Sequence, residues 1–215
     1  GGHAGDTDSM TKTVSLAKQY GVQIGAHPSY PDKENFGRQT LNIDIPTLKA
    51  SLLEQIQTLM SISKNQQVTV GYIKPHGALY NDLTKNADLL VLMLEVAHHF
   101  SIPLMMMAHP KNSNHQALAT RFQAHLIFEA FVDRAYTDDG DLVSRKLPHA
   151  VHTDEKKILK QAKSIASEGG LYSENNQWLS VSAQSLCVHS DSLEAVKHIE
   201  RIRQTLNLKR SALNV

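Results

Sequence analysis

Central to the chain is the segment Gly71-Tyr72-Ile73-Lys74-Pro75-His76-Gly77-Ala78-Leu79-Tyr80-Asn81, in which a cation and an imidazole follow a predicted strand. Residues 68–73 are apolar and partly β-branched, which is typical of a buried strand. Pro75 removes a backbone donor and disfavours a helical conformation at Lys74, and the glycine two residues later permits a tight turn. The strand is therefore expected to end where Lys74 and His76 are presented, which is where functional groups lie in parallel α/β folds.

Predicted helices and strands alternate on both sides of this segment. Helical spacing of apolar residues, together with cap residues, predicts helices over residues 7–20, 46–60, 86–100, 116–122, 154–167 and 191–206. Short apolar runs predict strands over residues 22–26, 68–73, 102–108, 126–132 and 185–188, with a hairpin over residues 171–181. This alternation favours right-handed βαβ units and a parallel sheet.

Several of the predicted strands end in polar residues that can do chemistry. These residues are His27, Lys74 with His76, His109, Asp133 with Arg134, and His189. Their recurrence at strand ends suggests that one face collects functional groups, as in a (β/α) barrel. An open doubly wound sheet is the alternative, and periodicity does not distinguish the two. Since no linker or internal repeat is present, we expect a single domain over residues 1–215.

Composition excludes several classes of protein. A formal net charge of +1 argues against electrostatic binding to nucleic acid or to an anionic membrane. The single cysteine, Cys187, allows no internal disulfide and is compatible with a reducing compartment, so we expect a cytoplasmic protein. The chain starts at Gly1 without a methionine, and its first residues look like a strand end with no strand before it. We therefore expect that an N-terminal part is absent from this sequence.

Five motifs in one order resemble the LamB/YcsF family. They are Gly1-Gly-His-Ala-Gly-Asp6, Gly25-Ala-His-Pro-Ser-Tyr-Pro-Asp32 with Asn35-Phe-Gly-Arg38, Lys74-Pro-His-Gly-Ala-Leu-Tyr-Asn81, Phe131-Val-Asp-Arg-Ala-Tyr136, and Cys187-Val-His189 with Asp191. The resemblance runs almost from the first residue to the last. It implies an irregular (β/α) barrel of the glycoside hydrolase/deacetylase type, here lacking its N-terminal strand.

The resemblance also implies an activity and partners. The expected reaction is the cleavage of 5-oxo-L-proline to L-glutamate, coupled to hydrolysis of ATP, in a complex with 5-oxoprolinase subunits B and C. The chain departs from the family pattern in lacking an acidic Asp-Leu-Asn-type first strand. Two further departures are Ser190 in place of the usual glycine and the run Met105-Met106-Met107 in place of small residues.

Opening a cyclic amide in this way requires cations for a carboxylate and a transferring phosphoryl group, and a base for water. We assign the catalytic roles to His76, Lys74, His27, His3 and Asp133. We assign binding of the substrate or phosphate to Arg38, Arg134, His189, Asp6 and Asp191. Nucleotide binding would use an arrangement other than a Walker-type loop, which the sequence lacks, or a partner subunit.

Simpler roles compete with these assignments. Asp6 and Asp191 suit helix N-caps, and Asp133 and Arg134 can pair with each other. Two other functions stay open: a metal-dependent deacetylase or amidohydrolase acting alone, and a non-catalytic substrate-binding subunit. A divalent metal is left open as a cofactor, because histidines and aspartates end several strands but no His-x-x-x-His pair is present.

Overall fold

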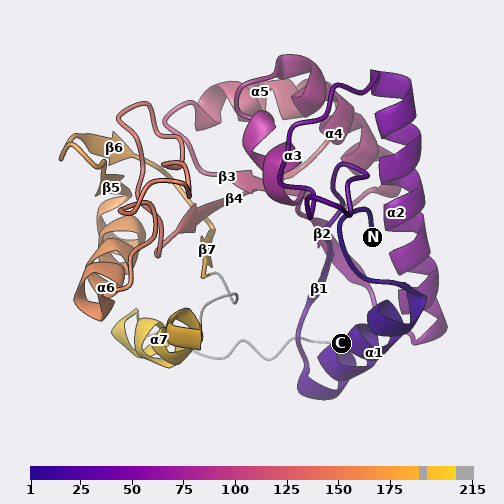
Figure 1. The fold of residues 1–215 in the computed structure, drawn as a ribbon, viewed down its shortest axis with the longest axis horizontal. Coiled ribbons are helices and arrows are strands. Elements are labelled where there is room, and N and C mark those ends of the chain that lie inside the picture. The colour runs from indigo at the N-terminus through magenta and orange to yellow at the C-terminus, as the bar shows by residue number, and fades with distance from the viewer. Residues whose placement is uncertain (189–192, 207–215) are drawn as a thin grey trace. The chain divides into compact units, whose positions relative to one another are not determined.

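The computed structural model describes residues 1–188 and 193–206 (Figure 1). These residues divide into two compact units. Of the described residues, the first unit comprises 1–106 and 116–126, and the second comprises 107–115, 127–188 and 193–206. The expectation of one domain over residues 1–215 stays a prediction.

The first unit is built on parallel strands. Strand β2 (Val70–Ile73) pairs in parallel with β1 (Ile24–Ala26) and with β3 (Leu104–Met107). The helices are α1 (Thr7–Tyr20), α2 (Ile45–Asn65), α3 (Gly77–Asp82) and α4 (Ala87–Phe100). Helix α5 (Asn112–Arg121) begins in the second unit and ends in the first. Ala26 lies beside Ile73 in the register of β1 and β2, so both strands end at the same level.

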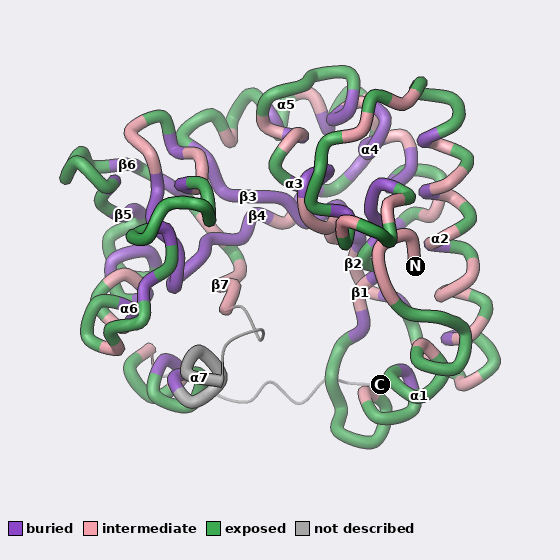
Figure 2. Tube along the Cα trace, in the orientation of Figure 1, coloured by how far each residue is buried: buried purple, intermediate pink, exposed green. Residues whose placement is uncertain are grey.

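Apolar side chains at helical spacing place the core of this unit. Leu48, Leu52 and Ile56 lie one turn apart on α2 and have no exposed surface. Figure 2 shows that α4 is buried along much of its length and that β3 is buried throughout. A strand buried on both faces is typical of a parallel sheet covered by helices.

Truncating Leu52 is expected to destabilise the first unit strongly. Leu52→Ala removes buried methyl groups from a site with 0 % exposure, so the free energy of unfolding should fall by about 2–5 kcal/mol. Leu16→Ala on α1 is the control, because Leu16 is 43 % exposed and its loss should change stability by at most about 0.5 kcal/mol. Urea denaturation followed by circular dichroism measures both, and equal midpoints for the two variants would contradict the expectation.

The second unit joins a parallel pair to a hairpin. Strand β4 (Leu126–Phe131) pairs in parallel with β7 (Ser185–Cys187), and β5 (Gly170–Tyr172) pairs antiparallel with β6 (Trp178–Ser180). Helix α6 (Glu155–Lys163) continues as a π-helical turn (Ser164–Glu168), and α7 (Leu193–Thr205) is the last described helix. The predicted hairpin over residues 171–181 is confirmed.

The predicted α/β class with parallel strands is confirmed, with most predicted elements shifted by a few residues at their ends. The main difference is α3, where we predicted only a turn after Gly77. A helix of six residues that starts at a glycine is too short to show an apolar period. None of the helices in the described residues combines the length and the apolar run that crossing a membrane takes.

Candidate functional site

Three histidines from separate parts of the sequence lie together in the first unit. His3 stacks on His76 with ring centroids 3.7 Å apart, and the centroids of His27 and His76 are 4.9 Å apart. One ring nitrogen of each histidine lies within 4.8 Å of the other two. The structure therefore brings together three of the predicted catalytic residues, although they are 24 to 73 positions apart in the chain.

Backbone hydrogen bonds between consecutive motifs place His27 and His76. The amide of Lys74 donates to the carbonyl of Ala26 at 2.8 Å, and the amide of His76 donates to the carbonyl of Pro28 at 2.8 Å. These bonds extend the parallel pairing of β1 and β2 past the strand ends. Each imidazole is thus fixed to a rigid sheet, as a functional group requires.

A glutamine holds the N-terminal segment that carries His3. The Gln55 Oε1 atom accepts from the amides of Gly2 and Ser29, each at 3.0 Å, and its Nε2 donates to the Ser29 carbonyl at 3.0 Å. The His3 Nδ1 atom lies 3.1 Å from the Ser29 hydroxyl. We did not predict Gln55, because it lies mid-helix on α2, far from every motif, and nothing in its local sequence marks it.

The other ring nitrogens contact backbone carbonyls and each other. His27 Nδ1 lies 2.6 Å from the carbonyl oxygen of Lys74, and His76 Nε2 lies 2.9 Å from that of Phe36. His76 Nδ1 lies 3.0 Å from His27 Nε2. The rings are therefore held in fixed orientations, and each contact constrains which nitrogen carries hydrogen.

The surroundings keep these imidazoles neutral. Burial, followed by the neighbouring His76 and His27, lowers the pKa of His3 to about 3. Burial also lowers the pKa of His27 to about 4, against the opposing effect of its hydrogen bond to Lys74. His27 as a whole keeps exposed surface. For His76, burial and then the nearby Arg38 and Lys74 lower the pKa. Neutral rings offer lone pairs to a proton or a metal ion.

The lowered histidine pKa values predict a loss of stability on mild acidification. An unfolded histidine takes up its proton near pH 6.5, whereas folded His27 does so only near pH 4. Between these values the unfolded chain binds more protons, so the free energy of unfolding falls as the pH drops. We expect the urea midpoint of the metal-free chain to fall from pH 7 to pH 5. His27→Gln should reduce that fall and His99→Gln should not; equal slopes would contradict the expectation.

Two predicted cations and an aromatic ring flank the imidazoles. The Lys74 ammonium is 5.8 Å from the centroid of the Tyr80 ring, and the Arg38 guanidinium is 5.1 Å from that of Phe36. Phe36 also meets His76 edge-on, at 5.3 Å between ring centroids. Its backbone has a φ of +55°, an uncommon conformation for a residue other than glycine. Cations beside neutral bases suit a substrate that carries or develops negative charge.

The loop that carries Phe36 and Arg38 is tied down by a carboxylate. Asp82, at the end of α3, accepts from the Tyr30 hydroxyl at 2.9 Å and from the Thr40 hydroxyl at 2.9 Å. Burial of Tyr30, together with this bond, raises the pKa of its hydroxyl above the ordinary value. We did not single out Asp82, because its partners lie more than 40 positions away in the sequence.

Asp6 caps the first helix. Its side chain accepts from the amide and the hydroxyl of Ser9, and the Ser9 hydroxyl in turn accepts from the Asp6 amide. This capping box is the simpler role that the sequence also allowed for Asp6. A role for Asp6 in binding substrate stays a prediction.

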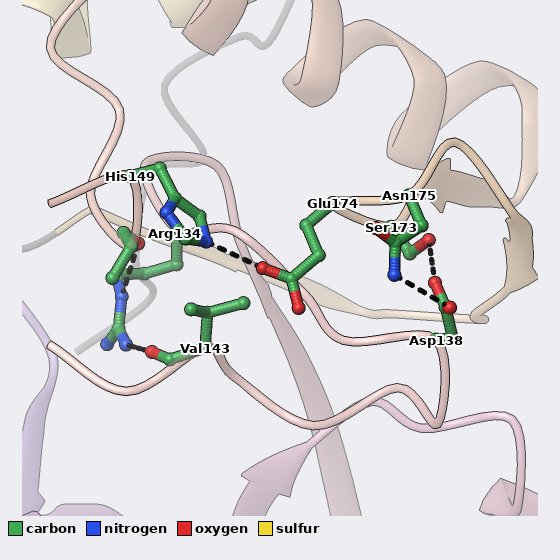
Figure 3. Close-up of polar contacts among 8 residues, drawn as sticks. Arg134, Asp138, Val143, His149, Ser173, Glu174 and Asn175 are labelled. Atoms are coloured by element: carbon green, nitrogen blue, oxygen red, sulfur yellow. Dashed lines mark hydrogen bonds and ion pairs between the residues drawn. The ribbon is translucent and has the colours of Figure 1, made fainter. Parts of the chain in front are cut away.

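Asp133 and Arg134 belong to the second unit and are both buried. Arg134 donates through Nε to the carbonyl of Ala150 at 3.1 Å and through a terminal nitrogen to that of Val143 at 2.6 Å (Figure 3). The carbonyl of Asp133 accepts from the amide of His152 at 2.8 Å. These bonds fasten the segment after β4, and the substrate roles of both residues stay predictions.

His189 and Asp191 lie outside the described residues, so their roles also stay predictions.

A second polar network ties the same segment to the hairpin. His149 lies 2.7 Å from a carboxylate oxygen of Glu174, and Asp138 accepts from Ser173 and from Asn175 (Figure 3). The hydrogen bond from Ser173, then that from Asn175, lowers the pKa of the Asp138 carboxyl. We did not predict a role for these residues, because none of them lies in one of the sequence motifs.

Together, the fold and the cluster define an α/β protein in which imidazoles and cations gather beside the ends of two parallel strands. Comparison with known proteins identifies the family within this class: the model of the LamB/YcsF family matches residues 1–214. The chain belongs to the LamB/YcsF family, as the sequence motifs predicted.

Curated relatives and one solved structure agree with this membership. The chain is 46 % identical over 209 residues to the 5-oxoprolinase A subunit of Pseudomonas fluorescens, covering 96 % of this chain and 84 % of the relative. It is 38 % identical over 206 residues to that of Vibrio campbellii, covering 96 % and 82 %. The Lactam Utilization Protein of Thermus thermophilus superposes with a TM-score of 0.86 at 27 % identity, covering 96 % of this chain and 83 % of that one. The predicted fold type is thereby confirmed.

Proposed function

We propose that this chain is the A subunit of a 5-oxoprolinase that cleaves 5-oxo-L-proline to L-glutamate and couples the reaction to hydrolysis of ATP to ADP and phosphate. The observation that carries the proposal is the cluster of neutral His3, His27 and His76 beside Lys74 and Arg38. The names of the curated relatives, each a 5-oxoprolinase A subunit, supply the substrate.

The chemistry of a cyclic amide explains why such a site is useful. Amide resonance makes direct attack by water slow, so transfer of the ATP γ-phosphoryl group to the amide oxygen would activate the ring carbon. Water then adds to that carbon while a base takes one of its protons, and the carbon–nitrogen bond breaks as the ring nitrogen takes up a proton, which leaves a γ-glutamyl phosphate. A second water hydrolyses this acyl phosphate to glutamate and phosphate. In this scheme a neutral imidazole is the base. Lys74 and Arg38 stabilise the negative charge of the carboxylate and phosphoryl oxygens.

Reconstitution with partner subunits tests the proposal. The chain is mixed with purified 5-oxoprolinase subunits B and C, and glutamate and phosphate are measured with 5-oxo-L-proline and ATP. We expect both products in equal amounts, and neither when ATP or this chain is omitted. Glutamate release that proceeds at the same rate without this chain would overturn the proposal.

The three-histidine cluster also favours a second candidate, a metal-dependent deacetylase or amidohydrolase acting alone. This function needs no ATP and no partner, and chelation of the metal abolishes it. Turnover of a lactam or an acetylated amine by the isolated chain, sensitive to chelator, would select it over the first. The third alternative is a non-catalytic substrate-binding subunit. Binding of 5-oxo-L-proline without turnover in the reconstituted complex would favour this alternative over the other two.

A further inference from the structure

The contacts of His27 and His76 leave a position between the two rings that neither ring fills with a hydrogen. Three contacts run in a row: the Lys74 carbonyl to His27 Nδ1, His27 Nε2 to His76 Nδ1, and His76 Nε2 to the Phe36 carbonyl. A carbonyl oxygen only accepts, so both outer contacts require an N–H. A neutral imidazole carries one N–H. The outer contacts therefore use both, and two nitrogen lone pairs face each other 3.0 Å apart in the middle.

Either a proton or a metal ion can lie between two facing lone pairs. A proton would make the pair cationic, and Lys74 and Arg38 already surround it with positive charge. A metal ion also brings positive charge, but it forms coordinate bonds to both lone pairs and can take an anionic further ligand that offsets the charge.

The outer contacts are those that metal-bound histidines make. A histidine that binds a metal through one nitrogen almost always donates its other N–H to a carbonyl, a carboxylate or water, which fixes the tautomer. His27 and His76 both do so, towards Lys74 and Phe36. With zinc–nitrogen bonds of about 2.0–2.1 Å, tetrahedral ligands lie about 3.3 Å apart. The observed 3.0 Å therefore needs only a small opening of the pair.

His3 supplies a third nitrogen. The Ser29 hydroxyl donates to the Tyr30 carbonyl at 2.8 Å, so towards His3 Nδ1, 3.1 Å away, it acts as the acceptor. The hydrogen of His3 is then on Nδ1, and Nε2 keeps its lone pair. The His3 ring lies parallel to His76, with an angle of 3° between the planes, so it must turn to point this lone pair at a shared ion.

We propose that His27 Nε2, His76 Nδ1 and His3 Nε2 bind one divalent transition metal ion of the kind that prefers imidazole, with Zn²⁺ as the first choice. Three protein ligands leave a fourth position open, as in catalytic rather than structural zinc sites. Lys74 and Arg38 add positive charge around that position. The fourth ligand is therefore expected to be an anion, such as hydroxide, a carboxylate or a phosphate oxygen. This inference does not depend on the proposed function, because metal binding is measured without turnover. In the metal-bound form the three imidazoles would hold the ion, and a hydroxide in the fourth position would be the base in place of an imidazole.

Titration of the metal-free chain with metal alone tests the site. The full chain is treated with chelator, dialysed, and titrated with ZnCl₂ by calorimetry and with CoCl₂ by visible absorption. We expect one equivalent of either metal to bind, with Co²⁺ giving the intense visible bands of a site with four ligands. Loss of groups that only support metal ligands weakens binding by roughly 10–100-fold, so His27→Ala and His76→Ala should each weaken it by more than about 100-fold.

Matched controls separate ligand loss from misfolding. His99→Ala changes an exposed histidine at the end of α4 and should bind Zn²⁺ like the parent chain. His27→Gln keeps a polar side chain if the alanine variant fails to fold, and it should also lose the Co²⁺ bands. Absence of saturable Zn²⁺ and Co²⁺ binding to the folded parent chain would overturn the proposal. So would a His76→Ala variant that binds as tightly as the parent, or ¹⁵N spectra showing a proton shared by His27 and His76 after Zn²⁺ is added.

Discussion

Replacing His76 with alanine is expected to lower kcat/KM for glutamate release by about 10²–10⁴-fold in the reconstituted enzyme, the range supplied by a positioned acid or base. His76 stacks on His3, contacts His27 Nε2 at 3.0 Å and lies within reach of the charges of Lys74 and Arg38. Its removal therefore disturbs the whole cluster. Lys74→Ala should cause a loss of similar size, because it removes the positive charge that the proposed mechanism uses to stabilise the carboxylate and phosphoryl oxygens.

Control variants make this expectation specific. His99→Ala removes an exposed imidazole and should leave glutamate release unchanged. Lys74→Arg retains the charge but not the shape of the ammonium group, so it should recover only part of the activity. Circular dichroism and unfolding midpoints close to those of the parent chain show that each variant is folded. Full activity in a folded His76→Ala variant would exclude His76 as a reacting group, and full activity in a folded Lys74→Ala variant would exclude Lys74.

A methyl group at Gly77 is expected to disrupt the turn that presents His76. Gly77 has a φ of +58°, and a Cβ there would lie 2.3 Å from the carbonyl oxygen of Gly37. That oxygen accepts from the amide of Ala78 at 3.0 Å, in the same loop as Phe36, whose carbonyl contacts His76. Gly77→Ala therefore combines left-handed strain of about 1–2 kcal/mol with an overpacking cost of about 1–3 kcal/mol.

Gly21 provides a close control for this substitution. It has a φ of +61° at the end of α1, and a Cβ there would meet nothing within 4 Å. Gly21→Ala should therefore show only the left-handed strain, about 1–2 kcal/mol in the free energy of unfolding. The difference between the two variants in urea denaturation isolates the clash with Gly37. Equal destabilisation by both would show that the loop moves aside, and that the turn does not depend on this close approach.

The turn at Gly77 and the imidazole of His76 belong to one structural arrangement. Gly77 lets the chain turn directly after β2, and the turn brings the loop that holds Phe36 against His76. The Phe36 carbonyl then fixes the orientation of the imidazole, and nearby Arg38 and Lys74 help to keep it neutral. A change at any of these positions should therefore alter the chemistry of His76 even where the imidazole itself is retained.

Local patterns in the sequence determined much of the fold. Helices α2 and α4 follow from apolar residues at helical spacing, and β2 ends at Lys74-Pro75 because proline limits the residue before it. The order of motifs also predicted the family and a set of polar residues at strand ends. These features depend on residues within a few positions of each other, so they can be recognised without knowing the fold.

The tertiary structure alone decided which of those residues meet and in what chemical state. His3, His27 and His76 form one cluster because β1 and β2 end at the same level and because Gln55 ties the N-terminal segment to Ser29. Their tautomers depend on carbonyls of Lys74 and Phe36, and their pKa values depend mainly on burial. Such effects act through space over a few ångströms between residues that are far apart in the chain, and no local pattern records them.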